Sequence, residues 1–177
     1  MILLGSTRHS CMMLLSAVLS LAASGQQAMP NTAGETLSGM RIVLANVVPG
    51  HETILVAGFS HEGGMKTADW MKAIQNDKAL DGVSVYEVAM LASAPGFVRG
   101  MIKSGMRKGQ PVERQDHTVV LTEDEKVWQT YFGVENDQVP YVLLIGGNGA
   151  ILWRGHGEAT DEEPKLRAAV QNGSTVH

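Results

Sequence analysis

Residues 53–59, with the sequence TILVAGF, constrain the fold of this chain more than any other segment. The run is apolar at almost every position and has the length of a β-strand, which is typical of a strand buried on both faces. Such a strand requires a sheet that is covered by helices on each side. A glycine-rich stretch follows at 60–65, and apolar residues at helical spacing then predict a helix over residues 66–76.

Strands and helices alternate along the remainder of the chain. Further strands are predicted at 41–48, 83–91, 117–121, 141–145 and 150–154. Further helices are predicted at 95–106, 123–133 and 161–171. This order of elements predicts an α/β fold of three layers, with a mixed central sheet and helices on both of its faces.

The 177 residues are enough for one domain with a complete hydrophobic core. Near the N-terminus, Arg8 precedes an apolar run and a small-residue stretch suited to a signal peptidase. We predict a signal peptide over 1–24, a flexible lead-in over 25–39, one domain over 40–172 and a disordered tail over 173–177. The predicted localisation is export, to the periplasm or the exterior, with an uncleaved membrane anchor or a mitochondrial location as alternatives.

Charge and cysteine content exclude several classes of function. The chain carries 14 basic and 18 acidic residues. Loss of Arg8 with the signal peptide takes the formal net charge from −4 to about −5, so a general nucleic-acid-binding protein is not expected. Cys11 is the sole cysteine and lies in the predicted signal peptide. The mature domain is therefore predicted to contain no disulfide, no thiolate nucleophile and no cysteine-bound zinc.

Two segments resemble the thioredoxin-like fold. One is the strand and helix at 53–76, and the other is the sequence VPYVLL, which begins at Val139 and leads into the final pair of strands. The resemblance implies a cis peptide bond before Pro140, facing the start of the first helix. It also implies that the positions from Gly64 to Thr67 correspond to the place where thioredoxins carry their redox cysteines.

The stretch 85–157 carries a more specific resemblance. It contains the sequences GMRKG, DHTV and GAILWRGHG. These motifs resemble the thioredoxin-like family of assembly factors for the membrane sector of ATP synthase, which is known from mitochondria and has bacterial relatives. The residues that carry this resemblance are Gly105, Met106, Arg107, Asp116, Thr118, Trp153, Arg154 and Gly157.

No catalytic residue, metal site or cofactor is predicted. A threonine hydroxyl cannot perform thiol–disulfide exchange, and the Gly-x-Ser-x-Gly motif of a serine hydrolase is absent. The His-Glu pairs at 51–52 and 61–62 offer metal-ligand atoms, but their spacing fixes no third ligand. Two alternatives stay open: an atypical oxidoreductase or peroxidase-related enzyme that uses His61 or His117, and a small-ligand or metal-binding module on the proline face.

The segment 99–114 is strongly basic in an otherwise acidic protein. Its basic residues are Arg99, Lys103, Arg107, Lys108 and Arg114. The first three are spaced four residues apart, which on a helix places them in one cationic stripe. We predict that these five side chains form a binding surface for an anionic stretch of a partner or for acidic lipid headgroups. An ordinary solvated surface is the simpler alternative.

The sequence thus predicts an exported, thioredoxin-like protein without catalysis, which acts as a binding or assembly factor with a chaperone-like role. Its expected partner is a protein in or at a membrane, and an anionic lipid surface is a second candidate. The family resemblance implies that the assembled complex is ATP synthase.

Overall fold

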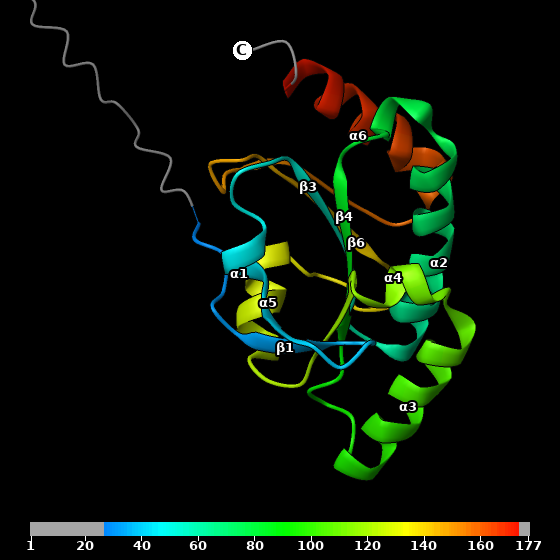
Figure 1. Ribbon diagram of the computed structural model, residues 1–177. Coiled ribbons are helices and arrows are strands. Elements are labelled where there is room, and N and C mark those ends of the chain that lie inside the picture. The colour runs from blue at the N-terminus through cyan, green and yellow to red at the C-terminus, as the bar shows by residue number, and fades with distance from the viewer. Residues whose placement is uncertain (1–26, 174–177) are drawn as a thin grey trace, which may run out of the picture.

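Residues 27–173 are described by the computed structural model of the protein (Figure 1). The predicted signal peptide at 1–24, with Cys11, and residues 174–177 of the predicted tail lie outside this range. Between residues 27 and 173, no helix combines the length and the apolar character that are needed to cross a membrane.

The fold is built on one sheet of seven strands, in the order β2-β1-β5-β4-β3-β6-β7. The strands are β1 Ala33–Thr36, β2 Arg41–Val43, β3 Thr53–Gly58, β4 Ser84–Met90, β5 Thr118–Leu121, β6 Tyr141–Ile145 and β7 Ile151–His156. β3 runs parallel to β4 and β4 parallel to β5, whereas the other neighbouring pairs are antiparallel. The prediction of a mixed sheet is confirmed.

Helices cover both faces of this sheet (Figure 1). α1 Leu44–Val47 and α5 Glu125–Phe132 lie on one face, and α2 His61–Asn76 and α6 Ala159–Gly173 lie on the other. Two short helices, η1 Lys78–Leu80 and α4 Val112–Gln115, belong to connecting segments. α3 Gly96–Gly109 lies near the start of α2 and buries none of its residues. The predicted three-layer α/β architecture is confirmed.

β3 lies inside the sheet between β4 and β6, and all six of its residues are buried. Leu55 and Ala57 belong to the core cluster beneath α1 and α5, whereas Ile54 and Val56 belong to the cluster beneath α2 and α6. This alternation follows from the two-residue period of a strand. Both faces of β3 are covered, and the apolar run from which it was predicted is explained by that burial.

Two predictions for the N-terminal part of the domain are wrong. Strand β1 lies inside the segment 25–39, where the sequence indicated a flexible lead-in. It is held by its pairing with β2 and β5, and its local sequence carries no strand pattern. The strand predicted at 41–48 ends at Val43 and continues as α1. Leu44 and Val48 lie one helical turn apart and enter the same core cluster, which favours a helix here.

Candidate functional site

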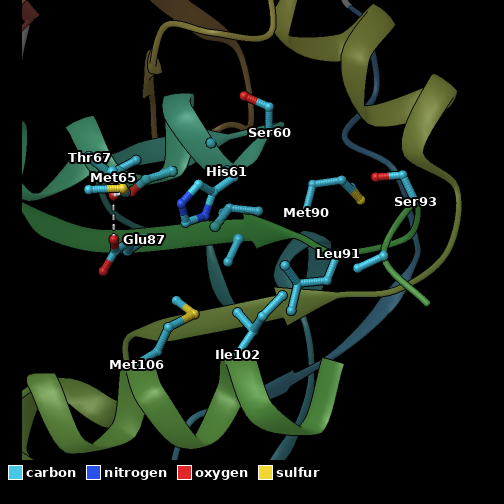
Figure 2. Close-up of a pocket in the computed structure, with 15 residues that line it drawn as sticks. Ser60, His61, Met65, Thr67, Glu87, Met90, Leu91, Ser93, Ile102 and Met106 are labelled. Carbon is cyan, nitrogen blue, oxygen red and sulfur yellow. Dashed lines mark hydrogen bonds between the residues drawn. The ribbon is translucent and has the colours of Figure 1, made fainter. Parts of the chain in front are cut away.

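A cavity of about 510 Å³ lies between the first turns of α2, the end of β4, and α3. It is located at the carboxyl ends of the parallel strands β3 and β4, where ligands commonly bind in open α/β sheets. Figure 2 shows side chains from α2, β4 and α3 around the space between the two helices. The lining residues are Gly58, Ser60, His61, Gly64, Met65, Thr67, Glu87, Val88, Ala89, Met90, Leu91, Ser93, Ala94, Ile102 and Met106.

The start of α2 forms one wall of this cavity, and it begins at His61, earlier than the sequence predicted. Gly63 N donates to Ser60 Oγ at 3.1 Å, and Ser60 Oγ donates in turn to Asp137 O at 2.6 Å. The glycines of the stretch 60–65, which the sequence placed before the helix, lie in its first turn. Gly63 is required there because a Cβ atom would lie 2.5 Å from Asp137 O. The loop that contains Asp137 is thereby held against the start of α2.

The peptide bond before Pro140 is trans, as are all peptide bonds among the described residues, so the prediction of a cis bond is wrong. The trans isomer is the lower in free energy by about 0.5–1 kcal/mol. Hydrogen bonds from the side chains of Ser60 and Lys66 to carbonyl oxygens of the preceding loop fix that loop in place. Pro140 is buried and does not line the cavity, whereas Gly64 and Thr67 do.

A buried carboxyl group lies in the cavity wall formed by β4. It belongs to Glu87, which is 7% exposed. Thr67 Oγ1 lies 2.6 Å from Glu87 Oε1, and Gln110 Nε2 donates to Glu87 Oε2 at 2.6 Å. Thr118 Oγ1 donates to Gln110 Oε1 at 2.7 Å. These contacts join α2, β4, β5 and the residue after α3 in one polar network beside an otherwise apolar space.

The cationic stripe predicted on α3 is turned toward the protein itself. Arg99 donates to two carbonyl oxygens of the loop that precedes α3, at 2.8 and 2.7 Å. Lys103 Nζ lies 2.6 Å from Glu35 Oε1 in β1. Arg107 Nε donates at 2.6 Å to the carbonyl oxygen of Leu37, just after β1. Because α3 buries no residue, these polar contacts are a main attachment of the helix to the domain.

The other two cations of the basic segment differ in their surroundings. Lys108 is exposed. Arg114 lies against Gln75 of α2, whose amide oxygen accepts from Arg114 Nη1 at 2.6 Å in the amide orientation that pairs donor with acceptor. The structure thus engages four of the five cations within the chain, and a docking role for the surface that they form stays a prediction.

Two residues of the first two motifs, Met106 and Thr118, belong to the cavity or to its polar network. Met106 lines the cavity, and Arg107 attaches the same helix to the end of β1. Thr118 is buried and bonds to Gln110, the partner of Glu87. Asp116 is exposed at the end of α4.

The residues of the third motif lie in or just after the edge strand β7, and their side chains contact elements on both faces of the sheet. Arg154 Nη1 donates to Tyr131 O at 2.7 Å and so connects β7 with α5. Trp153 packs against the core cluster beneath α2 and α6. Gly157 has a φ of +95°, which favours glycine, and its carbonyl oxygen accepts from Trp70 Nε1 at 2.7 Å.

The cavity offers a ligand apolar side chains together with the polar groups of Ser60, His61, Thr67 and Glu87. Residues 27–173 contain no cysteine, so no thiol stands at the start of α2. The His-Glu pairs at 51–52 and 61–62 lie at opposite ends of β3, and the described residues contain no cluster of three side chains that could hold a metal ion. His117 packs against Tyr86 with ring centroids 4.9 Å apart and ring planes tilted by 34°, and it does not line the cavity.

Sequence reasoning missed Glu87, Met90 and Ile102 as site residues. A usable signal existed for Glu87, because an acidic residue inside the apolar strand VYEVAML is expected to be paired or functional once it is buried. Met90 and Ile102 gave no such signal, since apolar residues on strands and helices more often belong to a closed core.

A family model described as the ATP10 protein matches residues 20–173 of the chain, which is most of its length. The chain belongs to the ATP10 protein family. This is the family of ATP synthase assembly factors with a thioredoxin-like fold that the sequence motifs indicated, so that resemblance is confirmed. No match is found among curated protein sequences.

Solved structures similar to this ATP10-family protein share its fold at low sequence identity. BsSco, a member of the Sco family of cytochrome c oxidase assembly proteins, is 14% identical with a TM-score of 0.57, over 86% of this chain and 95% of that chain. The exposed lipoprotein thioredoxin Etrx1 of Streptococcus pneumoniae is 15% identical with a TM-score of 0.54, over 80% and 99%. Arabidopsis thaliana ScoI, solved with copper bound, is 13% identical with a TM-score of 0.51, over 82% and 99%. These likenesses confirm the thioredoxin-like fold.

Proposed function

We propose that this ATP10-family protein is a non-catalytic assembly factor that binds a membrane-associated protein of ATP synthase. Its main support is the cavity at the start of α2, the place where thioredoxins carry their thiols. Here that place has no cysteine, and the space beside it is lined largely by apolar side chains. Membership of a family of ATP synthase assembly factors supports the choice of complex.

An apolar cavity at this position suits a protein that holds a partner without reacting with it. Three methionines, Met65, Met90 and Met106, line the space, and unbranched, flexible methionine side chains adapt to apolar surfaces of different shape. Removal of the partner's apolar surface from water contributes roughly 25 cal/mol per Å² to binding. We further propose that the protein acts after export, on the basis of the segment 1–24.

Affinity capture from native membranes tests the proposed partner. The tagged protein is crosslinked in cells, and membrane-sector subunits of ATP synthase are expected among the captured proteins. Met106→Asp should lower that yield, because it places a charge in the cavity wall. Met40→Asp is the matched control, since Met40 is 52% exposed and lies outside the cavity. The proposal is contradicted if no ATP synthase subunits are captured, or if Met106→Asp and Met40→Asp capture them in equal yield.

Redox assays test the absence of catalysis. Insulin reduction with dithiothreitol and peroxide consumption should both stay at the rate of the blank, because thiol-dependent forms of these reactions need a thiolate and residues 27–173 contain no cysteine. Turnover well above the blank would show a catalytic function. Cell fractionation, with N-terminal sequencing of the recovered protein, tests export independently; a full-length chain in the cytosol would contradict it.

A further inference from the structure

The carboxyl group of Glu87 has no cationic partner in the part of the chain that the structure describes. The ion pairs of residues 27–173 join other acidic residues to their lysines and arginines. Glu87 nevertheless lines the cavity and is 7% exposed. An ionised carboxylate that is removed from water without a counter-charge costs several kcal/mol. A ligand that brings a cation into the cavity would recover part of that cost.

The hydrogen bonds around Glu87 do not use all of its acceptor capacity. The Thr67 hydroxyl has a single hydrogen, and its oxygen lies 2.6 Å from Glu87 Oε1 and 2.7 Å from Gly64 O, so it donates to one of the two. The Thr118 hydroxyl is closer to Gln110 Oε1, at 2.7 Å, than to Glu87 Oε2, at 3.4 Å. An ionised carboxylate accepts about four hydrogen bonds, so acceptor positions are left for a donor in the cavity.

The surroundings of the carboxyl group select an apolar ligand. Met65, Met90 and Met106 line the cavity together with Leu91 and Ile102. Figure 2 shows Glu87 at the end of this space where Met65 and Met106 lie, one from each helix. A lysine or arginine side chain fits such a site, because its long apolar stem packs along apolar walls while its charged end reaches the acid.

Apolar surface also extends outside the cavity. Met65 is 67% exposed, Phe97 is 80% exposed and Met101 is 72% exposed. Phe97 and Met101 lie one turn apart on α3. Met101 is two residues from Lys103, which places it on the side of α3 opposite the contact with β1. A ligand that covers this exposed surface as well as the cavity is larger than a small metabolite and is best supplied by a protein segment.

We propose that the cavity binds an apolar segment of the partner protein that carries a lysine or arginine, and that the cation of this side chain pairs with Glu87. The inference rests on the proposed function, because it names the chemistry of the partner segment at the same cavity. A cationic side chain complements the charge of the Glu87 carboxylate, whereas a purely apolar or an acidic segment does not.

Short synthetic peptides test this choice directly. Fluorescently labelled peptides rich in leucine, alanine and valine carry arginine, lysine, norleucine or glutamate at the centre, and their binding to the protein is measured by anisotropy. The arginine and lysine peptides should bind at least about tenfold more tightly than the norleucine peptide, and the glutamate peptide should bind most weakly. Glu87→Gln keeps the shape of the side chain and should abolish the preference for the basic peptides.

Two further variants separate the pairing from general effects of charge or folding. Glu62→Gln removes an acidic residue from the first turn of α2. Glu62 does not line the cavity, so the preference for the basic peptides should persist in this variant. Met106→Lys places a cation of the chain itself near Glu87 and should weaken binding of the basic peptides most. Thermal unfolding confirms that each variant is folded. If Glu87→Gln does not fold, Met106→Lys decides the question.

Three results would overturn the inference. The first is no binding of the basic peptides, and the second is equal binding of the arginine and norleucine peptides. The third is an unchanged preference for the basic peptides in Glu87→Gln or, where that variant does not fold, in Met106→Lys. Each leaves the proposed function standing if the protein still captures ATP synthase subunits from membranes. Loss of that capture instead refutes the proposed function, whatever the peptides show.

Discussion

Gly63 and Gly64 are neighbours in the first turn of α2, and the structure predicts opposite effects for alanine at the two positions. A Cβ atom at position 63 would lie 2.5 Å from Asp137 O and 3.1 Å from Val139 O, both of them backbone atoms. A Cβ atom at position 64 would have no heavy atom within 4 Å apart from its chain neighbours and the backbone of its own helix. The first substitution therefore forces the loop away from α2, and the second does not.

The expected magnitudes follow from these distances. Alanine is favoured over glycine inside a helix by about 0.5–1 kcal/mol, so Gly64→Ala should raise the free energy of unfolding by that amount. Gly63→Ala has the same gain but introduces overpacking, which costs about 1–3 kcal/mol. It also strains the hydrogen bond from Ser60 Oγ to Asp137 O, worth about 1 kcal/mol. The net result should be a loss of about 1–3 kcal/mol.

Urea unfolding of the two variants beside the unsubstituted protein measures both effects. A change of 1 kcal/mol should also move the thermal midpoint by about 2–4 °C in a domain of this size. If both alanines shift the free energy of unfolding in the same direction and by similar amounts, then helix propensity governs this turn, and the close approach of the loop to Gly63 is not a constraint.

Three further predictions concern groups away from the cavity. Burial is the main cause that raises the pKa of Glu163 above its ordinary value of 4.5, and the hydrogen bond with Asp77 is the second. The folded protein thus keeps a proton on this carboxyl group at a pH where the unfolded chain releases it. Stability should therefore fall as pH rises above about 4.5, and Glu163→Gln should flatten this part of a thermal-unfolding profile from about pH 4 to about pH 7. Burial raises the pKa of Tyr131 to about 12, and its buried hydroxyl has no partner among the described residues. Tyr131→Phe should leave urea stability unchanged or raise it by about 1 kcal/mol, and a loss of similar size would contradict this. Trp70→Phe removes the bond to Gly157 O and should cost about 2–3 kcal/mol in the same assay; a neutral result would contradict that estimate.

The central part of the fold could be predicted because its signals are local. β3 was predicted from an apolar run, and β6 and β7 from two apolar runs around a glycine-rich turn; all three are present at nearly the predicted positions. β1 could not be predicted, because its four residues are held by strands that lie both next to it and far away in the sequence. The early start of α2 was hidden for a related reason: glycines in its first turn serve contact with a distant loop.

The candidate site was predicted in part. Gly64, Thr67 and Met106, named from the fold and the family, all line the cavity. Glu87 was missed, because its burial and its lack of a counter-charge among residues 27–173 are properties of the folded chain. The cations of α3 were predicted as a free stripe from helical spacing alone. Spacing gives the side of a helix on which residues lie, but it does not say whether that side faces solvent or another part of the protein.

By itself, the sequence determined the layered α/β architecture, the family, and the lack of a thiol at the start of α2, because each of these depends on residue type and on short-range pattern. The tertiary structure alone brought together the residues of the candidate site. In the folded chain, three basic side chains of α3 attach that helix to the domain, and Glu87 of β4 lies in the wall of the cavity between α2 and α3. Electrostatic and apolar contacts act through space, so the groups that make a binding site come together only when strands and helices distant in sequence pack against one another.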